Sequence, residues 1–343
     1  MHLRSLCTPS VRAGWACAAF ALGSAHADEV LRFGVQPSTQ PIYIARAAGL
    51  LAPIEARFHV KIRFYNFSYG GPENQAMAAG DLDLASAGMG PAVVAAARLP
   101  AELLAITVLD QTAILVPAGS PIHTLAQLKG QRIAYPGQGS QQYPLLLKAL
   151  QMAGLGEHDV TLFKTKGSDV PTLVEDGSVD AGITWDPAVS EALASGKARV
   201  LAMAGAILPL KDGHYVGDGV YGRTAYVSAH PALVEAILGA IIQSERLVLT
   251  HPNRAVTMWS QQLGFPPQVI RYSLRDGISV YDADIVPTPS VLDQYTRFLQ
   301  SAQILKPSDQ PHIAPQYAQA AEQAEHGPGM RHAADAAPAG AKL

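Results

Sequence analysis

The chain has 343 residues, of which 48% are hydrophobic and 15% are charged, and its formal net charge at pH 7 is −3. This hydrophobic content excludes an intrinsically disordered chain, and the length suits two domains of ordinary size. The small negative charge supplies no basic field for nucleic acid or for an anionic membrane surface, so neither is expected as a direct partner.

The first 27 residues have the pattern of a secretory signal peptide. Arg4 and Arg12 supply the positively charged start of such a peptide, and residues 13–22 are apolar. Ala25-His26-Ala27 fits a cleavage site of small residues. The apolar run is about half the length that a membrane span needs. We therefore expect export to the periplasm and cleavage after Ala27.

Both cysteines of the chain, Cys7 and Cys17, lie inside this N-terminal segment. The mature protein would then hold no thiol, which excludes disulfides, cysteine-ligated metals and cysteine nucleophiles. Lipid attachment at Cys17 stays open but is disfavoured, because no aliphatic residue stands three positions before it.

Strands and helices are predicted to alternate along the first part of the mature chain. Glycines end the predicted helices, and strand positions alternate between apolar and polar residues. The predicted order is a strand at 31–35, a helix at 42–48, a strand at 60–65 and a helix from Pro72 to Gly80.

A second alternating series follows Pro117 and repeats this plan. It comprises a helical turn at 125–129, a strand at 132–135, a helix at 141–153, a strand at 160–164 and a helix at 170–176. Alternation at this density predicts an α/β fold with two lobes, each an open, mostly parallel sheet flanked by helices. A ligand cleft is expected between the lobes.

Two apolar segments, 103–117 and 221–229, look strand-like and are predicted to cross between the lobes. Helices expected at 231–249, 252–263 and 290–305 would pack on lobe 1. The resulting division is residues 28–115 and 223–317 for lobe 1, 116–222 for lobe 2, and a disordered Ala-rich tail at 318–343.

One short motif occurs in both halves of the chain. Gly80-Asp81-Leu82-Asp83 in the first half matches Gly177-Ser178-Val179-Asp180 in the second. Each motif follows an apolar helix, places Gly where a left-handed C′ residue belongs, and leads through Asp into small apolar residues. The repeat predicts that each lobe contains a helix running directly into a buried strand.

The chain resembles the periplasmic solute-binding proteins of the nitrate, sulfonate and taurine group of ABC importers, whose fold is shared with thiamine-precursor binding proteins. The resemblance spans residues 31–313 and is carried by four motifs in order, at 79–83, 125–134, 149–155 with 159–160, and 179–187. It departs from the family at Asp186, where many relatives carry Glu.

This resemblance implies the extracytoplasmic substrate-binding component of an ABC transporter. Such a protein captures a small organic anion or zwitterion by hinge closure and delivers it to a permease with its ATPase, which is its only contact with the membrane. The alternative is a thiamine-pyrimidine precursor binding or synthase-like protein of the same fold. Oligomeric state and the identity of the ligand are left open.

Three glycine-containing loops precede predicted helices, at 67–72, 88–91 and 137–141. The N–H groups at a helix start attract anions, so these loops could hold an anionic head group without a cationic side chain. The simpler alternative is that the glycines only turn the chain and that Ser140 only caps its helix.

Trp185 ends a predicted buried strand, where ligands bind in open α/β folds, although a core Trp has the same pattern. Asp186 could contact the ligand or, as the simpler alternative, cap the next helix. The candidate ligand-binding residues are Gln36, Tyr43, Ser68, Gly88, Met89, Thr112, Gly139, Ser140, Gln141, Trp185, Asp186 and Tyr221.

No catalytic residues, metal site or cofactor are predicted. The sequence has no Gly-x-Ser-x-Gly elbow, phosphate-binding Lys loop or His-Glu-x-x-His motif, and its histidines show no metal-ligand spacing. The sequence therefore favours a binding protein over an enzyme.

Overall fold

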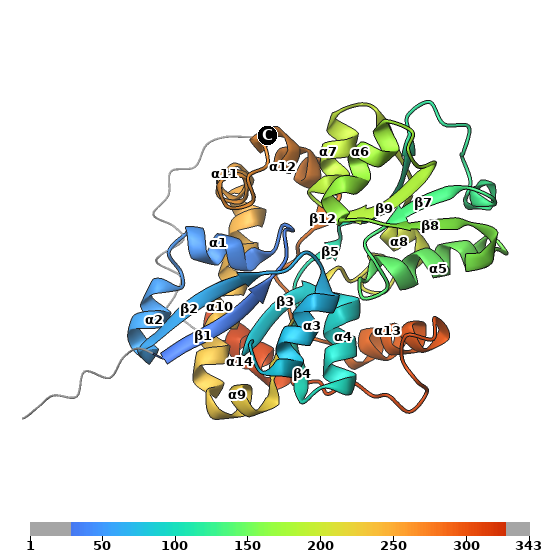
Figure 1. The fold of residues 1–343 in the computed structure, drawn as a ribbon. Coiled ribbons are helices and arrows are strands. Elements are labelled where there is room, and N and C mark those ends of the chain that lie inside the picture. Colours follow the sequence, from blue (N-terminus) through green and yellow to red (C-terminus); the bar gives the residue numbers. More distant parts are fainter. Residues whose placement is uncertain (1–28, 327–343) are drawn as a thin grey trace, which may run out of the picture.

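The computed structural model describes residues 29–326, which form two lobes with one five-stranded sheet each (Figure 1). The predicted signal peptide and cleavage site, with Cys7 and Cys17, lie outside the described residues, as does the tail from residue 327. The two-lobed α/β architecture with open sheets flanked by helices confirms the predicted fold class.

The lobe 1 sheet has the strand order β2-β1-β3-β11-β4. Its strands are β1 (Glu29–Val35), β2 (Val60–Asn66), β3 (Leu84–Gly88), β4 (Ala101–Ile106) and β11 (Asp218–Arg223). The helices between them are α1 (Pro41–Ala47), α2 (Ala52–Phe58), α3 (Gly70–Ala79) and α4 (Met89–Arg98).

The lobe 2 sheet has the strand order β10-β6-β9-β7-β8. Its strands are β6 (Thr112–Pro117), β7 (Arg132–Tyr135), β8 (Thr161–Lys164), β9 (Ala181–Trp185) and β10 (Ala198–Met203). Its helices are α5 (Gln142–Met152), α6 (Val170–Glu175), α7 (Ala188–Ala194) and α8 (Ala204–Ile207).

In each sheet only the strand that arrives from the other lobe runs against its neighbours. β11 is antiparallel to β3 and β4, and β6 is antiparallel to β9 and β10. The predicted lobe boundaries therefore need correction. Thr112–Pro117 already pairs in the lobe 2 sheet, and Asp218–Arg223 already pairs in the lobe 1 sheet, because a crossing strand satisfies its backbone in the sheet that it enters.

The two apolar crossing segments are also more divided than predicted. The first comprises β4, the short strand β5 (Leu109–Asp110) and β6, and β5 pairs with β12 (Ser279–Val280). In the second, strand structure ends with β11, and α9 (Thr224–Ala229) follows.

The C-terminal part of the described chain is helical and comprises α10 (Pro231–Thr250), α11 (Pro252–Leu263), α12 (Pro267–Arg275), α13 (Pro289–Ser301) and α14 (Pro315–His326). α10 packs on α1 of lobe 1, as predicted, whereas α12 packs on α7 of lobe 2. α13 shares one apolar core with α4 and α5 and so bridges the lobes, contrary to prediction.

The predicted disordered tail begins too early. Residues 318–326 belong to α14, which packs along α10, and Ala318 and Ala321 are buried there. Alanine and glutamine are good helix formers, and an Ala face suits close packing against another helix, so composition alone was misleading.

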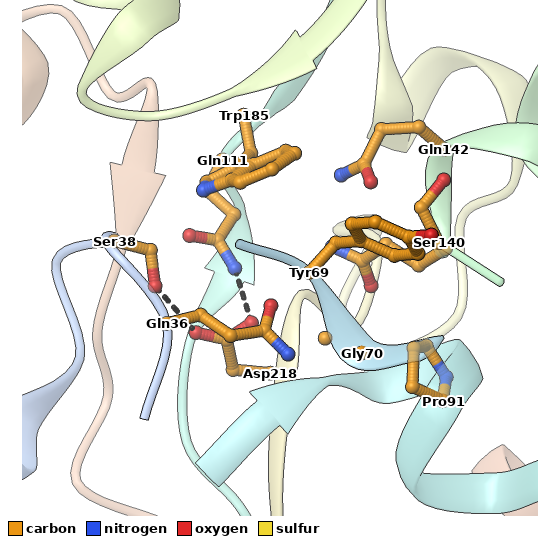
Figure 2. Close-up of a pocket in the computed structure, with 12 residues that line it drawn as sticks. Gln36, Ser38, Tyr69, Gly70, Pro91, Gln111, Ser140, Gln142, Trp185 and Asp218 are labelled. Carbon is orange, nitrogen blue, oxygen red and sulfur yellow. Dashed lines mark hydrogen bonds between the residues drawn. The ribbon is translucent and has the colours of Figure 1, made fainter. Parts of the chain in front are cut away.

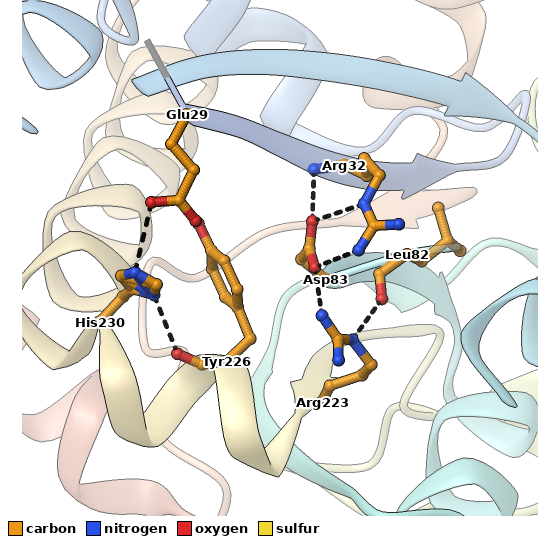
Figure 3. Close-up of polar contacts among 7 residues, drawn as sticks. All are labelled: Glu29, Arg32, Leu82, Asp83, Arg223, Tyr226 and His230. Atoms are coloured by element: carbon orange, nitrogen blue, oxygen red, sulfur yellow. Dashed lines mark hydrogen bonds and ion pairs between the residues drawn. The ribbon is translucent and has the colours of Figure 1, made fainter. Parts of the chain in front are cut away.

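The repeated motif has the predicted structure in both lobes. Gly80 and Gly177 have φ values of 80° and 74°, and the strands that follow, β3 and β9, are buried along their whole length. In lobe 1, Asp83 accepts hydrogen bonds from Arg32 and Arg223 (Figure 3). The motif Asp therefore ties neighbouring strands together behind the cleft.

Candidate functional site

A small cavity lies between the lobes (Figure 2). Its volume is about 10 Å³, close to the room that one water molecule needs. A ligand of several heavy atoms therefore requires the lobes to separate or the lining side chains to move. The lining residues are Gln36, Ser38, Tyr69, Gly70, Gly88, Pro91, Gln111, Ser140, Gln141, Gln142, Trp185 and Asp218.

The strand directions explain why these residues meet. Gln36, Gly88 and Trp185 stand at the carboxyl ends of β1, β3 and β9. Gln111 and Asp218 stand at the amino ends of β6 and β11, which run the opposite way, so they reach the same edges. The two sheets thus present to each other the edges at which ligands bind in open α/β folds.

Asp218 is the one carboxyl group among the lining residues. Its Oδ1 accepts a hydrogen bond of 2.6 Å from Gln111 Nε2, and its Oδ2 accepts one of 3.2 Å from Ser38 Oγ. Burial raises its pKa to about 6, although these hydrogen bonds lower it in part. No Lys, Arg or His lines the cavity to neutralise this carboxyl group.

A second buried acid lies behind the cavity and orients one of its walls. Gln36 Nε2 donates to Glu73 Oε2 at 2.5 Å, and burial raises the Glu73 pKa well above its usual range. This contact fixes the Gln36 amide nitrogen away from the lobe 2 side and leaves its carbonyl oxygen for a ligand. Together with Asp218, it makes the lobe 1 wall rich in hydrogen-bond acceptors.

Three helices begin at the cavity, namely α3, α4 and α5. Their N-cap residues are Tyr69, Gly88 and Gln141, and none of these makes a side-chain capping hydrogen bond. Their first backbone N–H groups and the positive ends of their dipoles therefore favour an anion.

A side chain of lobe 2 already bonds to the start of one of these helices, α4 of lobe 1. The backbone N–H of Met89 at the start of α4 donates to Gln141 Oε1 at 3.0 Å and also to the Gly217 carbonyl at 2.9 Å. The glycines at 88 and 90 make room, since a Cβ at either would lie 2.9 or 3.1 Å from Gln141. The Gln141 amide thus joins the lobes at a position suited to an anion.

The lobes also touch at the rim of the cavity. Trp185 Nε1 donates to the Pro37 carbonyl at 3.2 Å, and only 7% of Trp185 is exposed. A Cβ on Gly139 would lie 3.0 Å from the Gly71 Cα of the facing lobe. These contacts describe a closed arrangement of the two lobes.

Five of the twelve predicted ligand-binding residues line this cavity: Gln36, Gly88, Ser140, Gln141 and Trp185. The Ser140 hydroxyl donates to the Gly137 carbonyl at 2.7 Å and does not cap α5, whose N-cap is Gln141. The loop predicted at 137–141 therefore reaches the cavity, where the Ser140 hydroxyl bonds within the loop.

The other seven predicted residues do not line the cavity. The Met89 side chain is in the core, Ser68 is exposed, and Gly139 packs at the rim. The remaining four are polar groups paired within the protein: Tyr43 with the Gln36 carbonyl, Thr112 with Gln142, Tyr221 with Asn74, and Asp186 with Ser190.

Asp186 follows the simpler of its two interpretations. It is fully buried, and its Oδ1 accepts hydrogen bonds from the Ser190 backbone N–H, at 3.2 Å, and from the Ser190 hydroxyl, both in the first turns of α7. Burial raises its pKa to about 6. Asp186 thus stabilises the start of a helix and does not face the cavity.

The sequence-based prediction missed seven lining residues: Ser38, Tyr69, Gly70, Pro91, Gln111, Gln142 and Asp218. Tyr69, Gly70 and Pro91 lie in the glycine loops that it singled out, so the loops gave a usable signal. Gln111 lies in the apolar crossing segment predicted at 103–117, Asp218 lies three residues before the one predicted at 221–229, and no local pattern marks either residue.

Within residues 29–326, no helix combines the length and apolar character needed to cross a membrane. The same residues contain no cluster of three or more His, Cys, Asp or Glu side chains placed to hold a metal ion.

Comparison with known proteins places the chain among solute-binding proteins. The family model described as NMT1/THI5 like matches residues 36–255. The chain belongs to the NMT1/THI5-like family. This membership and the relatives described next confirm the resemblance on which the sequence-based prediction rested.

The chain is 30% identical, over 73% of its length and 77% of the relative's, to a protein of Escherichia coli (strain K12) named as an aliphatic sulfonates-binding protein. It is 26% identical to the taurine-binding periplasmic protein of the same strain, over 66% of its length and 68% of the relative's.

Among solved structures, the alkanesulfonate-binding protein SsuA from Xanthomonas axonopodis pv. citri, bound to MOPS, superposes with a TM-score of 0.71. The match has 27% identity and covers 84% of this chain and 99% of that chain. These relatives of the NMT1/THI5-like chain are binding proteins, and the taurine-binding relative is periplasmic, which agrees with the sequence-based prediction at this level.

Proposed function

We propose that this protein is the periplasmic substrate-binding component of an ABC importer and that it captures a small sulfonate, either an anion or a zwitterion such as taurine. The observation that carries this proposal is the cavity between the lobes, where three helix starts meet the buried carboxyl group of Asp218. A permease with its ATPase would receive the ligand from the closed form, and no cofactor is required.

The helix starts suit the anionic head group. Gly70 and Ser140 face each other across the cavity at the beginnings of α3 and α5, which have ten and eleven residues. A sulfonate has three acceptor oxygens and can accept hydrogen bonds from backbone N–H groups of both lobes at once. Its binding would therefore favour closure over the open form.

The acceptor-rich wall of lobe 1 suits the other end of a zwitterion. Asp218 and the carbonyl oxygen of Gln36 can both accept from an ammonium or hydroxyl group. An alkyl sulfonate without a donor would leave Asp218 without a charged partner. We therefore infer that ligands with a donor two carbons from the sulfonate bind more tightly than plain alkyl sulfonates.

The relatives support binding as the role of this cavity, because those that match along most of the chain are binding proteins. Among the described residues that line the cavity, the hydroxyl group of Ser38 donates to Asp218, and that of Ser140 donates to a backbone carbonyl.

A thermal-shift and calorimetry series tests this proposal. Taurine, isethionate, ethanesulfonate, nitrate and an aminopyrimidine would be titrated into the mature protein. We expect the melting temperature to rise with the sulfonates by mass action, with taurine and isethionate binding at least tenfold more tightly than ethanesulfonate. A response to the aminopyrimidine alone would support the thiamine-precursor alternative and contradict the sulfonate proposal.

Export completes the proposal. We propose that residues 1–27 direct secretion and are removed after Ala27. Mass spectrometry of protein from the periplasmic fraction should give a chain that starts at Asp28. A retained Met1, or a diacylglyceryl group on Cys17, would contradict this processing.

A further inference from the structure

The first crossing between the lobes contains an uncommon backbone conformation. Asp110 and Gln111, which join β5 to β6, have φ values of 59° and 54°. L-residues other than Gly rarely adopt this left-handed region, and Asp tolerates it better than Gln. Two such residues in succession, at the point where the chain changes lobes, indicate a conformation that the surrounding structure imposes.

Several contacts hold Gln111 in this left-handed conformation. Its backbone N–H donates to the Ile278 carbonyl at 2.7 Å, and its carbonyl accepts from the Asp186 N–H of lobe 2 at 2.8 Å. Its side chain passes over Gly217, which directly precedes β11 in the second crossing as the structure has it, and a Cβ on this glycine would lie 3.1 Å from Gln111 Cγ. The Gln111 backbone is thus held by bonds to Ile278 and to Asp186 of lobe 2, and its side chain is held against Gly217.

The side chain of this residue lines the ligand cavity. Figure 2 shows Gln111 Nε2 directed at Asp218, and the hydrogen bond between them measures 2.6 Å. Asp218 begins β11, so this bond links the first crossing to the second. Within the described part of the chain, Gln111 Oε1 is buried and has no hydrogen-bond partner.

We propose that Gln111 is the residue through which the ligand controls the hinge. A ligand group that donates to Asp218 lies beside the Gln111 amide and provides the missing partner for its Oε1. The bound ligand would hold this side chain in place, and with it the left-handed backbone of the crossing. The closed arrangement would therefore gain stability at the hinge as well as from contacts that the ligand makes between the lobes.

This inference rests on the proposed function, because taurine is the probe that it requires. Gln111→Gly removes the amide and accepts the left-handed conformation without strain. Gln303→Gly is a matched control, since Gln303 has a φ of 58° but is exposed after α13 and does not line the cavity. Both variants of the mature protein would be studied by calorimetry with taurine and by small-angle X-ray scattering.

We expect Gln111→Gly to bind taurine at least tenfold more weakly than the unaltered protein. Without ligand, we expect it to show a larger radius of gyration, because the crossing is less constrained. Gln303→Gly should match the unaltered protein in both measurements. Taurine affinity within twofold of the unaltered protein and an unchanged radius of gyration in Gln111→Gly would overturn the proposal.

A second variant keeps the test decisive if Gln111→Gly does not fold. Gln111→Asn retains an amide and tolerates the left-handed region, but it is one methylene shorter and cannot keep the 2.6 Å contact with Asp218. We expect a taurine affinity reduced about tenfold, and an unchanged affinity would refute the sensing role. Failure of the unaltered protein to bind any sulfonate would instead refute the proposed function. The scattering comparison without ligand would still test whether Gln111 constrains the hinge.

Discussion

Asp83 and Asp180 occupy equivalent positions in the two lobes, and each accepts the same set of hydrogen bonds from an arginine on the neighbouring strand. Arg32 donates to Asp83 from its backbone N–H, Nε and Nη2 at 2.7 to 2.9 Å. Arg132 donates to Asp180 from the same three groups at 2.8 to 3.0 Å. The internal repeat of the sequence therefore encodes a structural clamp at the ends of the sheets remote from the cavity.

The two clamps differ in burial, which predicts unequal contributions to stability. The Asp83 side chain is 3% exposed and also pairs with Arg223, whereas the Asp180 side chain is 30% exposed. Asp83→Ala should lower the free energy of unfolding by about 3 kcal/mol, because two half-buried arginines lose the buried carboxylate that they share. Asp180→Ala should cost about 1 kcal/mol. Urea denaturation followed by circular dichroism would measure both, and equal losses would contradict this ranking.

The cross-lobe hydrogen bond of Gln141 predicts a shift between open and closed forms. Gln141→Ala removes the contact with the Met89 N–H, worth about 1 kcal/mol, and should lower the ratio of closed to open forms of the unliganded protein about fivefold. Gln141→Glu places a carboxylate at the start of α4 and should favour closure while weakening sulfonate binding through competition. Small-angle scattering would report the closed fraction.

Gln151→Ala is a suitable control for this comparison, because Gln151 is an exposed residue later in α5. It should leave both the scattering profile and the affinity unchanged. If Gln141→Ala scatters as this control does, the amide of Gln141 does not hold the lobes together.

Asp218 predicts a pH dependence of ligand affinity. Because burial raises its pKa to about 6, the group is mainly neutral at pH 5 and mainly ionised at pH 7.5. An aliphatic ammonium stays protonated at both values. Taurine should therefore bind about tenfold more tightly at pH 7.5 than at pH 5. Calorimetry would measure this change, and Asp218→Asn should abolish it.

The same group has the opposite effect on the unliganded protein. Its pKa in the folded state lies above the ordinary aspartate value of 3.8, so its contribution to stability is full below about pH 4 and is lost as the pH rises through about 6. Unfolding at a series of pH values should show this loss in the unaltered protein and a smaller one in Asp218→Asn.

An affinity for taurine that falls with rising pH would contradict the assignment of the ammonium to Asp218.

The position of Trp185 between the lobes predicts that closure changes the tryptophan fluorescence. Its indole N–H bonds to Pro37 of the opposite lobe, whereas Trp259 is fully buried in lobe 1 and bonds to the Gln40 carbonyl. Addition of taurine should change the emission of the mature protein, and this change should persist in Trp259→Phe. Its persistence in Trp185→Phe would show that closure does not involve the Trp185 contact.

Local patterns in the sequence determined most of the architecture. The alternation of strands and helices, the glycine that ends each repeated helix, and the glycine loops before α3, α4 and α5 all depend on residues close together in the chain. They predicted two α/β lobes with helix starts at a cleft, and the fold and the family agree.

Only the tertiary structure decided which sheet each crossing segment joins and in which direction it runs. β6 and β11 insert into sheets formed by distant parts of the chain, and their direction brings Gln111 and Asp218 to the cavity. Nothing in the local sequence distinguishes a polar residue beside an apolar strand that lines the cavity from one that pairs only within the protein, as Asp186 does. That distinction depends on long-range strand pairing and on which buried groups find partners, which short-range spacing does not encode.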